Sequence, residues 1–107
     1  MPTSYDVINP ATEEIVKNVA HLDLAATDDV IAKAAHAFLT WRNVAPGERA
    51  RLLRSFSQIV TDHREELALL EITNSGHTRG NALWEADNVA NTLMYYASAP
   101  ELSLIHI

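Results

Sequence analysis

The sequence contains no cysteine among its 107 residues. This absence excludes disulfide bonds, thiolate metal ligands and a thiol nucleophile within the chain. Glycine is also scarce, and the three glycines, Gly47, Gly76 and Gly80, fit neither a G-x-G-x-x-G dinucleotide fingerprint nor a phosphate-binding P-loop. The chain therefore has no nucleotide-binding motif of its own and no residue for thiol chemistry.

Basic residues are in the minority: eight Lys and Arg stand against fourteen Asp and Glu, for a formal net charge of -6. A nucleic-acid partner is not expected, because binding to nucleic acid requires a basic surface. The first ten residues, M-P-T-S-Y-D-V-I-N-P, lack the basic and apolar regions of a secretory signal. No window approaches the ~20 apolar residues of a membrane span. These features predict a cytoplasmic protein that does not cross a membrane.

Two β-branched runs, residues 4–9 and 14–20, flank the tripeptide Pro10-Ala11-Thr12. Proline favours the start of a tight turn, so this arrangement predicts a β-hairpin. A two-stranded ribbon is marginally stable in water, and this one carries apolar residues on both faces. We therefore expect the hairpin to be covered by structure that the chain does not contain.

The spacing of apolar residues changes to a helical period after the hairpin. A first helix is predicted from Thr27 to about Trp41, with Asp28 and Asp29 as acidic first-turn residues. Pro46 is placed to open a second helix, because the missing N–H of proline costs nothing in the first turn. The apolar positions expected to form the buried stripe of this helix are Leu52, Leu53, Phe56, Ile59 and Val60.

Two further helices are predicted in the second half of the chain. The third begins near Arg64 and stops at Gly76, a suitable left-handed C-cap. The fourth begins at Thr78 and is ended by Pro100, and its apolar face consists of Leu83, Ala86, Val89, Ala90, Leu93 and Tyr96. The fold class expected of the chain alone is mainly α, an N-terminal β-hairpin followed by about four helices.

The histidines invite a metal site but are not spaced for one. They lack the i, i+4 pairing and the other spacings typical of zinc ligands. Solvent-facing or capping roles are favoured for all five, which are His21, His36, His63, His77 and His106.

The Arg49, Arg51 and Arg54 row offers an anion site near a helix start. Arginine at this spacing more often forms a solvated or ion-paired helix face, which is the interpretation we favour.

Aromatic and acidic residues at the end of the first predicted helix and along the fourth also have ordinary explanations. Trp41 and the Tyr95-Tyr96 pair offer stacking surfaces for a ligand, although aromatic residues at helical spacing more often pack in or around a core. Glu85 and Asp87 are not expected to act as a carboxylate pair, since neighbouring helical positions do not converge on one point. Residue chemistry alone thus predicts a helical, acidic domain without an active site.

Five segments follow one another in a recognisable order. They are V-I-N-P-A-T-E-E at 7–14, D-D-V-I-A-K-A-A-H-A-F-L-T-W-R at 28–42, P-G-E-R-A-R-L-L-R at 46–54, E-E-L-A-L-L-E-I-T-N-S-G-H at 65–77 and Y-Y-A at 95–97. In register and with matching gaps, they resemble the amino-terminal portion of the aldehyde dehydrogenase superfamily. The family's usual line there is N-P-A-T-G-E, A-F-x-x-W, P-x-x-R-x-x-x-L, E-x-G-K-P or D-T-G-K-P, and Y-Y-A-G. The resemblance covers residues 5 to about 101.

Three positions depart from this line. His77 stands where the family usually has Lys, Thr78 where Pro follows, and Ser98 where Gly follows Y-Y-A. These departures affect the assignment to a subgroup of the family rather than the resemblance to the family itself. The N-S-G-H-T run followed by N-A-x-W-E-A resembles an actinobacterial-type branch.

The resemblance implies a much longer parent enzyme with the α/β aldehyde dehydrogenase fold, which oxidises aldehydes to carboxylic acids with NAD or NADP. In such enzymes a cysteine thiolate attacks the carbonyl, giving a thiohemiacetal and then a thioester, and a glutamate activates the water that releases the acid. These groups and the cofactor loop lie downstream in the family. Residues 1–101 are then the N-terminal part of the cofactor-binding domain, expected to be inactive and to bind no cofactor alone. The parent is expected to be a homodimer or homotetramer.

Many relatives hold a monovalent cation between backbone carbonyls of the residues before N-P and the carboxylate before T-G or S-G. The corresponding residues here are Val7, Ile8 and Asn74, which the resemblance makes a candidate metal site. Asn74 offers an amide oxygen where relatives have a charged carboxylate, so cation affinity should be lower. A purely structural role for Asn74 at a helix C-terminus stays open.

The last six residues, L-S-L-I-H-I, bear on whether the chain is a fragment. They are the translation of CTG TCT CTT ATA CAC ATC, a transposase adapter sequence used in DNA library preparation. We therefore expect residues 102–107 to be a non-native tail, to be excluded from the fold. Two alternatives to an enzyme fragment stay open: a free-standing helical interaction module, and a small cation-binding structural protein.

Overall fold

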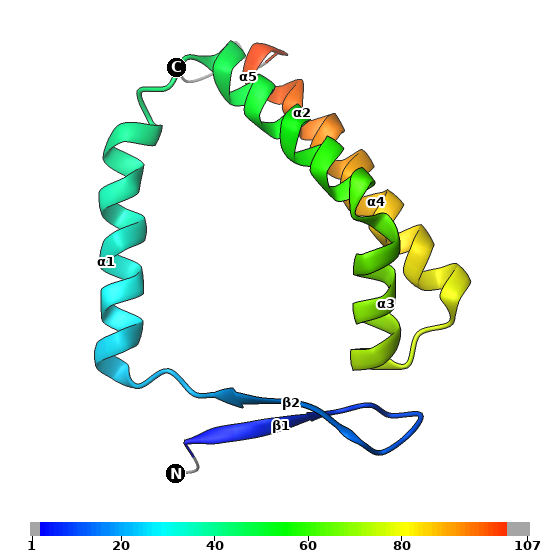
Figure 1. The fold of residues 1–107 in the computed structure, drawn as a ribbon. Helices are drawn as coiled ribbons and strands as arrows, with labels where there is room; N and C mark the ends of the chain where they lie inside the picture. Colours follow the sequence, from blue (N-terminus) through cyan, green and yellow to red (C-terminus); the bar gives the residue numbers. More distant parts are fainter. Residues whose placement is uncertain (1–2, 103–107) are drawn as a thin grey trace.

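The computed structural model describes residues 3–102, whose elements follow an open path (Figure 1). Strands β1 (Ser4–Ile8) and β2 (Ile15–Ala20) form an antiparallel hairpin. The helices are α1 (Leu24–Trp41), α2 (Pro46–Asp62), α3 (Arg64–Ser75), α4 (Arg79–Ala97) and the short α5 (Ala99–Leu102). The predicted hairpin followed by about four helices is confirmed, with α5 as an addition. Residues 103–107 of the expected tail, which include His106, lie outside the described residues.

The hairpin turn is held by local hydrogen bonds. Asn9 Oδ1 accepts a hydrogen bond from the backbone N–H of Ala11 at 2.9 Å, and the N–H of Asn9 donates to the carbonyl of Glu14 at 2.9 Å. Glu13 closes the turn in the left-handed region, with φ 61°. Strand pairing is irregular between Val7 and Ile8, where a bulge interrupts the ladder.

Helix α1 begins at Leu24, three residues before the predicted start at Thr27, so that prediction was wrong. The cause is Asp23, whose Oδ1 accepts a hydrogen bond from the N–H of Ala26 at 2.7 Å and caps the helix. Thr27 instead lies in the first turn, where its hydroxyl donates to the Asp23 carbonyl. Two capping residue types within one turn made the sequence ambiguous. The predicted end at Trp41 is confirmed.

The remaining helix boundaries agree with the sequence except at the end of α4. Helix α2 opens at Pro46, α3 ends at a left-handed Gly76 with φ 74°, and Thr78 is the N-cap of α4. Pro100 does not itself end α4, which stops at Ala97. Pro100 lies at the second position of α5, where a helix tolerates a missing N–H.

Helices α2 and α4 lie side by side, and α3 packs against α4 (Figure 1). Small residues make up nearly all of the buried core, namely Ala50, Ser57, Val60, Ala68, Ala82, Ala86, Ala90 and Ala97. The hydroxyl of Ser57 on α2 donates a hydrogen bond to the carbonyl of Ala90 on α4 at 2.8 Å. Alanine at these positions lets the two helix backbones approach closely.

The large apolar residues predicted to be buried are mostly exposed, which corrects the predicted stripe of the second helix. Leu52, Phe56 and Ile59 are 39%, 52% and 55% exposed, whereas Val60 is buried. Of the residues predicted to form the apolar face of α4, Ala86 and Ala90 are buried, but Val89 and Tyr96 are exposed. Amphipathic spacing identified the correct helices but not their partners, because the described chain provides no surface to cover these residues.

The described chain is far more open than a compact domain of its size. Its radius of gyration is 18.2 Å, against about 13 Å for a compact domain of this length. Its accessible surface is 8498 Å², against about 5,900 Å² for a compact monomer of this mass. Within residues 3–102, α1 makes no extended contact with another element (Figure 1). The accessible surface is therefore roughly 1.4 times that of a compact monomer.

Candidate functional site

The turn of the hairpin meets the end of α3 at two residues. The N–H of Gly76 donates to the carbonyl of Ile72 at 3.0 Å, which closes the helix with Gly76 in the left-handed region. A Cβ atom at Gly76 would lie 2.8 Å from Cγ of Pro10. Only glycine therefore fits both the backbone conformation and the approach of the proline ring.

The three residues of the candidate cation site flank this junction. Val7 and Ile8 lie at the end of β1, beside the bulge, and Val7 is half-buried. Asn74 is exposed in the last turn of α3, two residues before Gly76. The contact between Pro10 and Gly76 thus brings the end of the strand toward the end of the helix. Cation binding by these three residues stays a prediction.

A second cluster lies at the corner between α3 and α4. Nδ1 of His77 lies 3.2 Å from Oε2 of Glu85 on α4 and 3.9 Å from Oε1 of Glu71 on α3. One ligand atom from each residue lies within 4.8 Å of the other two. Nδ1 of His77 is itself buried and has no hydrogen-bond partner. The hydroxyl of Ser75 lies 2.7 Å from Oε1 of Glu71, to which it can donate.

Sequence analysis assigned His77 and Glu85 no common role and did not single out Glu71. The three residues lie six and eight positions apart, and the left-handed turn at Gly76 folds them together. The only local signal was the predicted C-cap at Gly76. It indicated a sharp turn after the third helix but not which side chains the turn would bring together.

An ion pair ties α3 to α4 near the cluster. Nε and one terminal nitrogen of Arg64 donate to the two carboxylate oxygens of Asp87, at 2.5 and 2.8 Å. This bidentate hydrogen bonding by Arg64 holds the pKa of Asp87 below its ordinary value of 3.8. Glu85 faces His77 instead, so the prediction that Glu85 and Asp87 do not form a carboxylate pair is confirmed.

The ion-paired interpretation of the arginine row is confirmed for Arg51. It donates two hydrogen bonds to the carboxylate of Glu48, at 2.8 and 2.6 Å, and these hold the pKa of Glu48 below its ordinary value of 4.5. The aromatic pair is different, because Tyr95 is 74% exposed and meets Tyr96 edge to face with ring centres 5.2 Å apart. These tyrosines do not pack in a core formed by the described residues.

Two other histidines have local partners. His63 lies between α2 and α3, and its Nδ1 is 2.8 Å from Oε2 of Glu66. The ring of His21 packs against that of Tyr5 with centres 5.2 Å apart. His63 is exposed, which agrees with a solvent-facing role, and its side chain forms no capping hydrogen bond to α3. Neither pair has a third ligand within the described residues.

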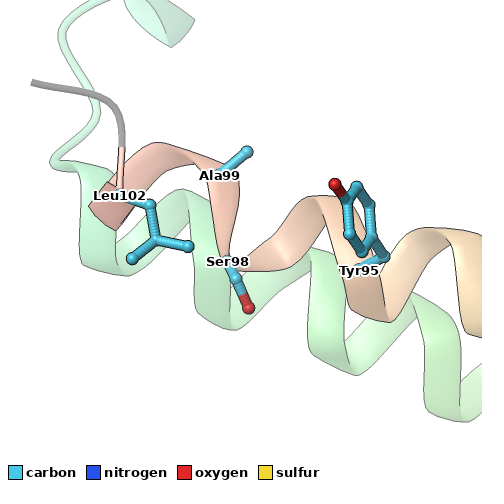
Figure 2. A pocket seen from close by; sticks show the side chains of 4 residues that line it. All are labelled: Tyr95, Ser98, Ala99 and Leu102. Atoms are coloured by element: carbon cyan, nitrogen blue, oxygen red, sulfur yellow. The ribbon is translucent and has the colours of Figure 1, made fainter.

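A hollow of about 550 Å³ lies at the junction of α4 and α5, lined by Tyr95, Ser98, Ala99 and Leu102. Figure 2 shows these four side chains. The four side chains point in different directions and do not converge on a common centre. Its lining contains no charged or metal-ligating group. This hollow therefore has no side chains that indicate a catalytic or metal-binding site.

Residues 1–104 match the profile of the aldehyde dehydrogenase family, so the chain belongs to that family. It is 37% identical over 99 residues to the malonate-semialdehyde dehydrogenase of Bacillus subtilis (strain 168), covering 92% of this chain and 20% of that protein. It is 36% identical over 92 residues to the mitochondrial succinate-semialdehyde dehydrogenase of Oryza sativa subsp. japonica, covering 86% of this chain and 18% of that protein. The chain thus spans about a fifth of the length of these relatives.

Solved structures of the family share the fold. The betaine aldehyde dehydrogenase of Staphylococcus aureus in complex with NAD⁺ superposes with a TM-score of 0.86 at 27% identity, over 91% of this chain and 20% of that one. An NAD-dependent benzaldehyde dehydrogenase from Corynebacterium glutamicum superposes with a TM-score of 0.89 at 25% identity. The match covers 92% of this chain and 22% of that one. The open arrangement of hairpin and helices is therefore one seen within complete enzymes.

In residues 3–102 no helix combines the length and the apolarity that a membrane crossing would need.

Proposed function

We propose that this chain is the amino-terminal part of an NAD(P)-dependent aldehyde dehydrogenase that oxidises aldehydes to carboxylic acids through a cysteine thiohemiacetal and thioester. The observation that carries the proposal is the family match over residues 1–104, in a chain one fifth as long as its relatives. A cysteine nucleophile must lie in the remainder of the parent, because this sequence contains none. The chain alone is then inactive.

The exposed apolar surface supports a role as part of a larger fold. The chain exposes about 2,600 Å² more than a compact monomer would, by comparison with the expected surface. A standard interface buries only about 800 Å² on each partner, so this excess corresponds to an intramolecular core rather than one docked protein. We therefore place residues 1–101 in the cofactor-binding domain of the parent and treat 102–107 as a non-native tail.

The residues present do not fit a dinucleotide, because Gly47, Gly76 and Gly80 form no phosphate-binding loop. We place the site for NAD or NADP in the remainder of the parent. When bound, that cofactor supplies the acceptor for the hydride of the aldehyde. The solved relatives named above carry NAD⁺ or are called NAD-dependent, which favours NAD as the first cofactor to assay.

Further features of the parent belong to the same proposal. A monovalent cation would bind the carbonyls of Val7 and Ile8 and the amide of Asn74, weakly because the amide carries no charge. We also propose a cytoplasmic homodimer or homotetramer without a nucleic-acid or membrane partner. The two relatives named for malonate and succinate semialdehydes make carboxylated aldehydes the first substrates to test.

The test is an assay of the full reading frame that contains residues 1–101. The expressed parent should reduce NAD or NADP only when an aldehyde is present, and alanine at its cysteine nucleophile should abolish turnover. The 107-residue chain serves as the matched control and should show no activity. A parent that folds but oxidises no aldehyde from a broad panel would contradict the proposal.

A further inference from the structure

We propose that Glu71, His77 and Glu85 form a binding site for a divalent transition-metal ion of the Zn²⁺ type. The inference rests on the corner between α3 and α4 and is independent of the proposed dehydrogenase activity. Each residue comes from a different segment: Glu71 from α3, His77 from the connecting turn and Glu85 from α4. A bound ion would therefore bridge two helices.

The spacing of the ligand atoms is close to that of a tetrahedral site. Bonds of about 2.0–2.2 Å from Zn²⁺ to nitrogen and oxygen place neighbouring ligand atoms roughly 3.3–3.6 Å apart. Nδ1 of His77 lies 3.2 Å from Glu85 Oε2 and 3.9 Å from Glu71 Oε1, and the longest separation in the group is within 4.8 Å. Bringing all three atoms to ligand spacing would require only rotations of the two partly exposed glutamate side chains.

The charges at this corner favour a cation. Two carboxylates face one imidazole, and within residues 3–102 neither Glu71 nor Glu85 forms an ion pair with Lys or Arg. A divalent ion would neutralise both of them while using the imidazole nitrogen as a ligand.

The environment of each ligand is also suitable. Nδ1 of His77 is buried, lacks a hydrogen-bond partner and faces the carboxylates, so an ion would satisfy an otherwise unpaired atom. The Ser75 hydroxyl can orient the Glu71 carboxylate, as outer-shell donors do for metal ligands. The three side chains are 39–42% exposed, which leaves room for a water ligand at the fourth position.

The ligand set selects the class of metal. One imidazole with two carboxylates suits Zn²⁺ and similar transition ions, whereas Mg²⁺ and Ca²⁺ prefer an all-oxygen set.

The test is a calorimetric titration with Zn²⁺ of the tag-free full-length parent that contains residues 1–101, repeated with Co²⁺ and followed by visible absorption. One ion per chain should bind at this corner, and amide exchange within residues 71–85 should slow in the same sample. The variants His77→Lys and Glu85→Gln should each lower the affinity at least ~10-fold, the effect typical of losing even an outer-shell partner. Lysine at position 77 still pairs with both carboxylates, so helix content should be retained.

The matched control is His63→Ala. His63 pairs with Glu66 at 2.8 Å but has no third ligand, so its loss should leave Zn²⁺ affinity unchanged. The proposal is overturned by the absence of saturable binding, by equal binding in wild type and His77→Lys, or by binding without slower exchange in residues 71–85.

Discussion

Pro10 in the hairpin turn lies directly against Gly76 at the end of α3, so close that a Cβ atom at Gly76 would lie 2.8 Å from the proline Cγ. This contact links the two parts of the chain that otherwise diverge, the hairpin and the packed helices α2 to α4 (Figure 1). It also places Val7, Ile8 and Asn74 on either side of one junction. The glycine is thus required both by its φ of 74° and by its neighbour.

Replacing Gly76 by Ala should open the last turn of α3. The left-handed conformation costs a non-glycine residue about 1–2 kcal/mol, and the contact with Pro10 adds to this cost. Amide exchange near Ile72 should therefore accelerate by roughly 5- to 30-fold. Gly80→Ala is the control: nothing lies within 4 Å of its Cβ position, so the change should be neutral or stabilise α4 by up to about 1 kcal/mol. Equal effects of the two substitutions would contradict this account.

Acid should loosen the contact between α3 and α4. Because Arg64 lowers the pKa of Asp87 in the folded chain, this pair stabilises the fold fully above the ordinary aspartate value of 3.8. The contribution is lost as pH falls through the lower folded-state value. A carbon-detected NMR titration of the Asp87 carboxyl should show this depressed pKa, and Arg64→Met should return it toward 3.8. An unchanged titration in Arg64→Met would show that the ion pair does not form.

Restoring a charge at position 74 should strengthen cation binding. Asn74→Asp supplies the carboxylate that a hard cation prefers, so in the full-length parent potassium should raise the thermal stability of this variant more than that of the wild type. The control is Asn88→Asp on the exposed side of α4, which adds the same charge away from the junction. If potassium stabilises both variants equally, the ion acts by screening and not at Val7, Ile8 and position 74.

The isolated chain should not melt as a cooperative monomer. Its large apolar residues stay exposed and its hairpin lacks a covering sheet, so it should bind a hydrophobic dye and self-associate. Calorimetry combined with analytical ultracentrifugation measures both properties. A sharp, reversible transition of a monomer would indicate a self-sufficient domain and favour the free-standing helical module.

Local chemistry was sufficient for several features of the fold. Pro46, Gly76 and Thr78 each act within one helical turn, so their positions predicted the start of α2, the end of α3 and the cap of α4. Asp23 and Thr27 both suit a cap, and only the hydrogen bond from Ala26 to Asp23 decides between them. The sequence alone does not distinguish the two candidate caps, because they lie about one helical turn apart and both residue types suit the position.

Features that depend on a distant partner could not be predicted from the sequence. Phe56 and Ile59 have the spacing of buried residues but are exposed, because burial requires a surface that residues 3–102 do not contain. The cluster of Glu71, His77 and Glu85 has no recognisable motif, since a turn and two helices bring its members together. Sequence periodicity gives the orientation of a helix, whereas tertiary structure decides what that helix meets.

The central claim, that this chain is part of a longer aldehyde dehydrogenase, is tested most directly by sequencing the genomic locus beyond the codon for Glu101. We predict a reading frame that continues past this point without the codons for L-S-L-I-H-I and encodes the cysteine nucleophile and glutamate base of the family. A genuine stop codon after Ile107, with those six codons present in the genome, would contradict it.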